Sequence, residues 1–306
     1  MKIIPIIVLS AAAASLGGCR HKAPPEPPLA TPSVTLSLDK APLGSPIDVT
    51  YRFDVAPDAP PFAEDYLVFV GIVDADQELM WTDDHDPPIP TKQWKPGQHI
   101  EYVRTVFVPV YPYIGDASFH MGLYSRTTQK RLPLGGQDAG QRAYIVAKLQ
   151  LLPQTESILT TPKEGWHGPE TPVNNQPHVE WQWTKKKQAT LAFKNPKKDA
   201  LFYLDLDFVL PPFERRQDGA SNPFPEGQHV QVRLGDQVVD EFRLDTDQRL
   251  LRKIPLTVAQ LGSQDMVELT LAVQKTFVPA LLPGAASTDP RELGVRVFHT
   301  YVEAKK

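Results

Sequence analysis

Apolar and polar residues alternate along most of this chain, and this pattern constrains the fold more than any other feature. Val49, Tyr51, Phe53 and Val55 would share one face of an extended segment, with polar residues between them. Side chains of a β-strand alternate between the two faces of its sheet, so this pattern is typical of a strand with one buried face. No long segment has helical periodicity, and only 256–261 hints at a helical turn. The sequence therefore predicts an all-β protein.

Two sets of alternating segments predict two domains. The first set runs from 33 to 150, with turn clusters spaced as in an antiparallel sandwich of about seven strands. The second set runs from 181 to 306 and includes a tight hairpin with Gly235-Asp236 at its turn. Residues 151–180 are polar and punctuated by proline, so we expect a linker there. The predicted fold is two antiparallel β-sandwiches of immunoglobulin-like or jelly-roll-like type.

The first residues of the chain have the features of an export signal. Lys2 is followed by an apolar run that ends at Leu16, and then by two glycines. The run is short for a membrane span, which needs about 20 apolar residues. Leu-Gly-Gly-Cys at 16–19 resembles the lipobox of bacterial lipoproteins. The alternatives are an ordinary secretory signal with an unrelated cysteine, or a short membrane helix.

The lipobox resemblance implies that residues 1–18 are a signal peptide and that Cys19 carries a diacylglycerol and a further acyl chain such as palmitate. Acyl chains hold a protein to a membrane because each buried methylene contributes about 0.8 kcal/mol. Residues 19–32 are rich in proline and would form a semi-rigid stalk. In lipoprotein families, a residue such as Arg20 after the cysteine favours the outer membrane of a host with two membranes. We therefore expect an exported, lipid-anchored protein of the bacterial cell envelope.

Composition and motifs limit the classes of partner. The formal net charge is −4, and no basic motif is present, so we expect no nucleic acid. Cys19 is the only cysteine, so no disulfide holds the domains. We expect no cofactor, since the chain has no phosphate-binding loop, and no Gly-x-Ser-x-Gly or His-Glu-x-x-His motif. The expected partners are the membrane, through the lipid, and an envelope glycan or envelope protein.

One stretch of the first domain resembles an accessory module of known enzymes. The residues that carry the resemblance are Asp84, His85, Pro87, Pro90, Thr91, Trp94, Pro96, Gly97, Gly122, Leu123, Tyr124, Arg131, Leu132 and Pro133. In order and spacing they resemble the all-β domain appended to some bacterial membrane glycosyltransferases of the dolichyl-phosphate-mannose mannosyltransferase type. The resemblance covers about 70–140 and implies a glycan-related setting. Glycosyl transfer itself is not implied, because the chain has no multi-span catalytic part.

The second domain resembles another all-β accessory module found with bacterial glycosyltransferases. The resemblance rests on Gly-Trp-His-Gly-Pro-Glu at 165–170, Trp-Thr at 183–184, Phe-Val-Pro-Ala at 277–280 and the segment 289–297. It implies the fold and the setting, and no mechanism.

The cluster Asp83-Asp84-His85-Asp86 is the best candidate for a metal or ligand site. Carboxylates and an imidazole can bind a divalent ion. Neighbouring residues of an extended segment point in opposite directions, however, and such side chains often bind nearby backbone N–H groups instead. We favour a structural role, with Asp84, His85 and Asp86 retained as candidates for contact with a sugar or polar ligand. We expect no metal.

Three candidate ligand-binding residues lie outside the first domain, two in the expected linker and one in the second domain. Trp166 and His167 lie in a glycine-flanked segment, where an exposed indole ring would form a stacking platform for a sugar. Arg291 stands between acidic residues, and its alternative role is an ion pair that fixes the last loop.

The leading functional hypothesis is a non-catalytic lipoprotein that binds or organises surface glycan, or binds a glycan-handling partner. A glycan hydrolase is one alternative, because two carboxylates about 5–9 Å apart are sufficient for that chemistry. Glu164, Glu170 and Glu180 are its candidates, although no motif singles them out. A structural assembly lipoprotein is the other alternative.

Overall fold

The computed structural model describes residues 26–172, 179–208, 224–245, 248–282 and 287–305. The expected signal peptide and the expected lipid-attachment site at Cys19 lie outside the described residues. In the part of the chain that is described, no helix has the length and apolar character needed to cross a membrane.

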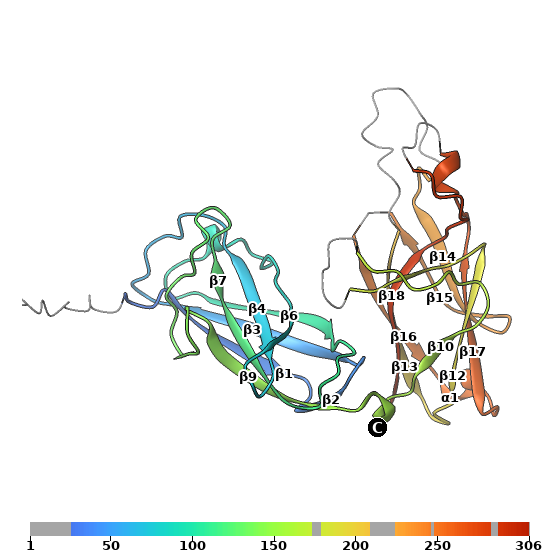
Figure 1. The fold of residues 1–306 in the computed structure, drawn as a ribbon, viewed down its shortest axis with the longest axis horizontal. Helices are drawn as coiled ribbons and strands as arrows, with labels where there is room; N and C mark the ends of the chain where they lie inside the picture. The colour runs from blue at the N-terminus through green and yellow to red at the C-terminus, as the bar shows by residue number, and fades with distance from the viewer. Residues whose placement is uncertain (1–25, 173–178, 209–223, 246–247, 283–286, 306) are drawn as a thin grey trace, which may run out of the picture.

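The chain forms two β-sandwiches, which lie at the two ends of its long axis (Figure 1). The prediction of an all-β fold with two antiparallel sandwiches is confirmed. Strands of the first sandwich are β1 (Ala30–Leu36), β2 (Lys40–Pro42), β3 (Pro46–Val55), β4 (Leu67–Val73), β5 (Leu79–Thr82), β6 (His99–Phe107), β7 (Gly115–Tyr124), β8 (Gln137–Asp138) and β9 (Tyr144–Leu152), with a short 3-10 helix η1 (Thr91–Gln93) before β6.

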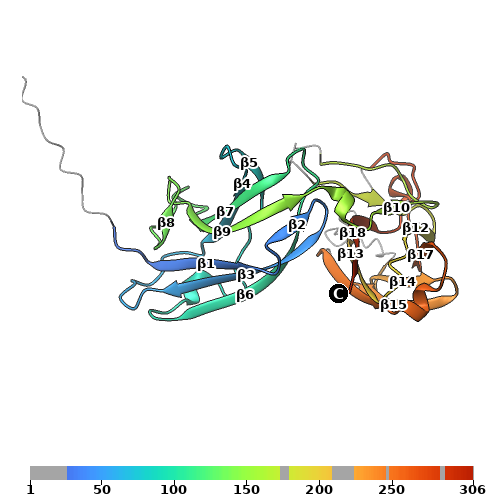
Figure 2. The ribbon, with the colours of Figure 1, turned by 90° about the horizontal axis from the view of Figure 1, so that it is seen from below.

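The two sheets of the first sandwich lie one above the other (Figure 2). One sheet has the order β1-β3-β6, and the other has the order β2-β9-β7-β4-β5, with β8 paired to β9. All pairs are antiparallel except β2 with β9. The alternating residues of β3 become the core as predicted, with Val49, Tyr51 and Phe53 fully buried. Each large apolar side chain buried in this way contributes about 1.5–3 kcal/mol.

The second sandwich pairs a five-stranded sheet, β10-β12-β17-β14-β15, with a four-stranded sheet, β11-β18-β13-β16. The elements are η2 (Gln154–Glu156), β10 (Thr160–Pro162), β11 (Gln182–Trp183), β12 (Gln188–Lys194), β13 (Ala200–Asp207), β14 (Gln228–Leu234), β15 (Gln237–Leu244), β16 (Leu250–Leu256), α1 (Val258–Leu261), β17 (Met266–Val273), η3 (Pro279–Leu281) and β18 (Arg296–Ala304).

Two local predictions in the second sandwich are confirmed. The hairpin between β14 and β15 turns at Gly235-Asp236, since Leu234 pairs with Gln237. The expected helical turn is α1, which begins with a capping box between Thr257 and Gln260.

The expected linker at 151–180 needs a correction, because much of it belongs to the second sandwich. Strand β10 pairs with β12 at the edge of the five-stranded sheet, where the missing N–H of Pro162 is tolerated. Trp166 and Glu170 make isolated bridges with Thr184 and Trp181. The prolines of this segment indicated a linker, but its residues between the prolines pair with strands of the second sandwich. At the other end of the first sandwich, β1 begins at Ala30, inside the expected stalk.

The four-stranded sheet of the second sandwich faces the first sandwich (Figure 1). Phe107 and Tyr203 are buried but belong to neither hydrophobic core, because they contact each other across the domain boundary. An ion pair between Lys253 and Asp48, 3.0 Å long, joins the same two surfaces.

Candidate functional site

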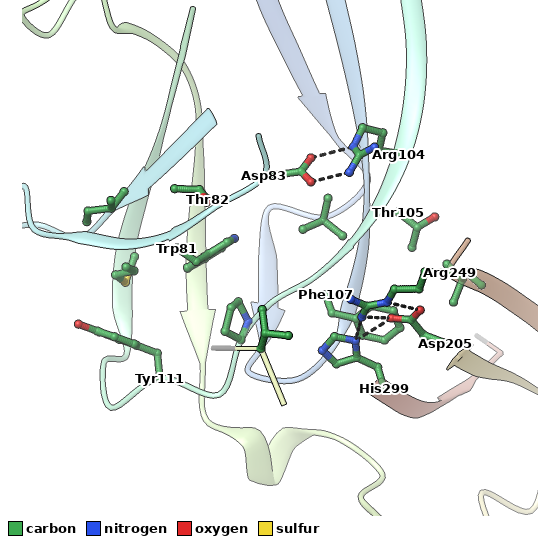
Figure 3. A pocket seen from close by; sticks show the side chains of 16 residues that line it. Trp81, Thr82, Asp83, Arg104, Thr105, Phe107, Tyr111, Asp205, Arg249 and His299 are labelled. Carbon is green, nitrogen blue, oxygen red and sulfur yellow. Dashed lines mark hydrogen bonds and ion pairs between the residues drawn. The ribbon is translucent and has the colours of Figure 1, made fainter. Parts of the chain in front are cut away.

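A cleft of about 830 Å³ lies between the two sandwiches, and Figure 3 shows its lining. The first sandwich contributes β5 with the residue that follows it, Asp83, and the end of β6. The second sandwich contributes side chains of β13 and β18, and the start of β16. Small-molecule sites are concave, often lie between domains and have volumes of roughly 300–1,000 Å³. The cleft is therefore the leading candidate for a binding site.

An aspartate–arginine pair lines the cleft on the first sandwich. Arg104 donates from Nε and Nη2 to the two carboxylate oxygens of Asp83, at 3.0 and 2.8 Å. The hydroxyl of Tyr51 donates to the same carboxylate at 2.8 Å. Such a two-pronged pair fixes both side chains, because a planar guanidinium matches the geometry of a carboxylate. Arg104 lies on β6, an edge strand of its sheet, and lines the cleft.

A second pair of the same kind lines the cleft on the other sandwich. Arg249 donates from Nε to Asp205 at 2.7 Å and also from Nη2 to the other oxygen of that carboxylate. Nδ1 of His299 lies 2.8 Å from Asp205. Burial alone would raise the pKa of Asp205, but hydrogen bonds from His299 and Arg249 outweigh burial and hold that pKa below its ordinary value. Asp205 is therefore a stable carboxylate at neutral pH.

Both pairs bury the acid and leave the arginine in contact with solvent. The side chains of Asp83 and Asp205 are 10% and 7% exposed, whereas those of Arg104 and Arg249 are each 40% exposed. At both pairs, the cleft therefore presents a partly exposed guanidinium group, and the carboxylate beneath it is buried.

Aromatic rings form the remaining chemical feature of the cleft. Trp81, Phe107 and Tyr111 line it on the side of the first sandwich (Figure 3). Phe107 lies against the imidazole of His299 and forms part of the floor. Aromatic rings give a polar ligand an apolar face to stack on, while the arginines supply hydrogen bonds.

The side chains of the cluster predicted at 83–86 do not lie together in the structure, and each has different partners. Among its members only Asp83 lines the cleft. Asp84 accepts a hydrogen bond from the backbone N–H of Val70 at 2.8 Å, and burial raises the pKa of Asp84. Asp86 is exposed and pairs with Arg126 at 2.8 Å.

His85 is buried inside the first sandwich. Its Nδ1 donates to the carbonyl oxygen of Asp83 at 2.6 Å, so its Nε2 accepts from the hydroxyl of Tyr102 at 2.8 Å. Burial lowers the pKa of His85, which agrees with this neutral form. Both ring nitrogens of His85 are thus used within the domain, whereas Asp84 is exposed and makes one such contact through Oδ1. In the described ranges, no group of three or more His, Cys, Asp or Glu side chains is arranged to hold a metal ion.

The sequence-predicted residues of the second domain do not line the cleft either. Trp166 is half-buried, donates from Nε1 to the carbonyl of Thr190 at 2.8 Å and lines a neighbouring cavity of about 450 Å³. His167 donates to the carbonyl of Glu292 at 2.8 Å. Arg291 pairs with Asp289 and, at 2.5 Å, with Glu170, as in the structural alternative.

Sequence reasoning did not identify Arg104, Asp205, Arg249 or His299. One signal was available, because two acids, Asp205 and Asp207, interrupt an otherwise apolar strand at alternate positions. Both are buried, and each needs a cation, which Arg249 and Arg296 provide. The Asp205–Arg249 pair lines the cleft and the Asp207–Arg296 pair does not. This difference depends on how the two sandwiches pack, which no local sequence pattern encodes.

No protein-family model and no curated protein matches the chain. Among solved structures, it is similar to a Salmonella alpha-2-macroglobulin mutant at 12% identity and a TM-score of 0.23, over 90% of this chain and 17% of that protein. It is also similar to a type II cohesin dyad from an adaptor scaffoldin of Acetivibrio cellulolyticus, at 9% identity and a TM-score of 0.18, over 90% of this chain and 88% of that one. A collagen adhesin from S. aureus has 8% identity and a TM-score of 0.18, over 90% and 96% of the two chains. Likeness at this level carries no argument about what the chain binds.

Proposed function

We propose that this protein is a non-catalytic, lipid-anchored protein of the bacterial cell envelope that binds glycan in the cleft between its two sandwiches. The observation that carries the proposal is the cleft itself, which combines aromatic rings with two aspartate–arginine pairs. The resemblance of both domains to accessory modules of glycosyltransferases, and of the N-terminus to a lipobox, supports the glycan and the envelope respectively.

A polar ligand suits this cleft better than an apolar one. A sugar ring has apolar C–H faces and hydroxyl edges, so it stacks on an aromatic ring and hydrogen-bonds to planar polar side chains beside it. Tyr111 supplies a partly exposed ring, and Arg104 and Arg249 supply fixed donors. Both arginines are held by their aspartates, so little side-chain freedom is lost when a ligand binds.

The chemistry of the acids supports binding rather than hydrolysis. A glycosidase needs one carboxylic acid with a raised pKa to protonate the leaving group. The two acids that line the cleft, Asp83 and Asp205, are each held by an arginine, and the pKa of Asp205 is lowered. Of the acids considered from sequence, Glu164, Glu170 and Glu180 are absent from the cleft lining.

Filling the cleft tests the proposal. Thr82 is exposed, ends β5 and lines the cleft, so Thr82→Trp places a bulky ring in the cleft with little cost to the core. We expect the full chain to bind polysaccharide extracted from envelopes in co-sedimentation, and Thr82→Trp to abolish binding. Thr161→Trp is the matched control, because Thr161 is an exposed strand residue outside both cavities. Equal binding by both variants would refute a role for the cleft.

The anchor is tested separately. Replacement of Cys19 by serine removes the sulfur that would carry the lipid, so labelled palmitate should no longer enter the protein. Both sandwiches should still unfold at the wild-type temperature, because among the described residues the first core and the apolar side chains packed against it begin at Leu29. Labelling of the serine variant would show that Cys19 is not the attachment site.

A further inference from the structure

We infer that the ligand of the cleft carries an anionic group, a carboxylate or a phosphate, bound between Arg104 of the first sandwich and Arg249 of the second. This inference rests on the proposed function and narrows it to an acidic glycan. It follows from which hydrogen-bonding groups of the cleft are already used and which remain.

The acceptors of the cleft are largely used within the protein. The carboxylate of Asp83 receives two bonds from Arg104 and one from Tyr51. The carboxylate of Asp205 receives two bonds from Arg249 and contacts Nδ1 of His299. Both carboxylates are also at least nine-tenths buried. A cationic group of a ligand would therefore find few accessible carboxylate oxygens.

The donors are less completely used. Arg104 and Arg249 each bind their aspartate through Nε and Nη2, and neither Nη1 has a partner among the described residues. Each side chain is 40% exposed. The two arginines come from different domains and line the same cleft, so a ligand in the cleft would meet a guanidinium group from each sandwich (Figure 3).

A third donor lies on β5 of the first sandwich. The indole N–H of Trp81 is buried and has no hydrogen-bond partner in the described parts of the chain. Trp81 is only 6% exposed, and its nitrogen points toward the side of the cleft that holds Arg104 and Phe107 (Figure 3). A buried donor without a partner is costly and rare, and an indole N–H can only donate. An acceptor on the ligand would satisfy it.

The charged groups of the cleft that remain accessible are thus the two guanidinium groups, whereas the hydroxyl of Thr82 can donate or accept. Carboxylates and phosphates are acceptor-rich and match a guanidinium in geometry and charge, whereas a neutral hydroxyl forms weaker bonds with it. Each arginine of the cleft is neutralised by its aspartate, so the formal charge of the lining is small. The guanidinium is nevertheless the part of each pair that a ligand can contact.

The test compares one sugar with and without its charge. The probes are a glucuronate-containing hexasaccharide, its methyl ester, which retains the shape and removes the charge, and the same hexasaccharide carrying phosphate in place of carboxylate. Binding to the full chain is measured by calorimetry at constant ionic strength. We expect at least one anionic probe to bind about tenfold or more tightly than the ester, since a charge-assisted hydrogen bond accounts for that ratio. The preferred anion distinguishes a carboxylate ligand from a phosphate ligand.

Variants locate the effect. Arg249→Gln should weaken binding of the preferred anion about tenfold more than it weakens binding of the ester, because only the anion forms a charge-assisted bond with the guanidinium. Arg252→Gln is the matched control, because Arg252 makes the same two-pronged pair with Asp240, at 2.9 and 2.8 Å, outside the cleft. Because loss of either arginine alone takes the guanidinium from a buried aspartate, the double changes Asp83→Asn with Arg104→Gln and Asp205→Asn with Arg249→Gln are also measured, and their folding is checked by circular dichroism.

The outcomes separate this inference from the function on which it rests. Equal affinity for ester and anions would overturn the anionic ligand and leave glycan binding standing. An equal loss in Arg249→Gln and Arg252→Gln would overturn the assignment to the cleft arginines. Failure of every probe to bind, together with failure of envelope polysaccharide to bind, would overturn both.

Discussion

The phenyl ring of Phe107, at the end of β6, lies flat against the imidazole of His299 on β18, with ring centroids 4.2 Å apart and ring planes 4° from parallel. His299 also contacts Asp205 and Arg249 through Nδ1. His299, which contacts the first sandwich, is therefore also in contact with the Asp205–Arg249 pair that lines the cleft. Domain packing and the shape of the candidate site depend on the same contact.

Replacing Phe107 by alanine should loosen the two sandwiches without unfolding either, because Phe107 belongs to neither core. An aromatic pair contributes about 0.5–1.5 kcal/mol beyond the area that it buries. We expect a larger radius of gyration in small-angle X-ray scattering and weaker glycan binding. Val103→Ala is the control, since Val103 lies on the same strand but is exposed. An unchanged scattering profile for Phe107→Ala would contradict the prediction.

Asp205 predicts a pH dependence of stability. Its folded-state pKa lies below the ordinary value of 3.8. Its stabilising effect is therefore fully present above about pH 4 and is lost as the pH falls through the folded-state pKa. We expect Asp205→Asn to be less stable than wild type at pH 7 in urea unfolding, and the difference to shrink toward pH 3. Asp58→Asn, at an exposed loop, should differ little from wild type at either pH. A gap that stays constant down to pH 3 would be inconsistent with this account.

Trp94 should be essential to the first core. Its side chain is buried, its ring contacts Phe53 and Phe62, and its Nε1 donates to the carbonyl of Ile89 at 2.9 Å. Replacement by alanine should cost about 3–5 kcal/mol, as for other buried large aromatic residues. Chemical denaturation measures this cost. Ile114→Ala, at an exposed position, should change stability by less than about 0.5 kcal/mol.

Divalent metal ions should not stabilise the segment 83–86. Its carboxylates are held by Arg104, by the N–H of Val70 and by Arg126, so none converges with another on a common point. A specific ion would stabilise by about 2.7 kcal/mol at a hundredfold excess over its dissociation constant. We therefore expect equal melting temperatures after chelator treatment and in millimolar Ca²⁺, Mg²⁺ or Zn²⁺. A metal-dependent rise that Asp84→Asn and Asp86→Asn both abolish would overturn the structural role.

The fold could be predicted from sequence because its signals are local. Alternation in β3 identified the buried face, and Gly235-Asp236 identified a hairpin, since the side-chain period and the turn type depend only on neighbouring residues. Strand β10 was missed because it has three residues and ends on a proline, which leaves too short a pattern to recognise.

The candidate site was not predictable in the same way. Arg104 and Arg249 lie 145 positions apart and come together only through the packing of two separately folded sandwiches. Conversely, Asp84 and His85 attracted attention as functional groups, but the backbone N–H of Val70 and the hydroxyl of Tyr102 are their partners. Polar residues close in sequence are often bound by their own domain, and sequence spacing does not show this.

The connection between the sandwiches is short, and this has a consequence for their energetics. Strand β9 ends at Leu152, and Ile158 already bridges to Val302 of the second sandwich. Such a tether spans at most about 20 Å, so each domain experiences the other at an effective concentration in the millimolar range. The contacts of Phe107 with His299 and Tyr203, and the ion pair of Lys253 with Asp48, are too weak to hold free partners together but can then keep the domains apposed. A ligand that contacts both walls of the cleft would need only a modest intrinsic affinity for each to act as a clasp.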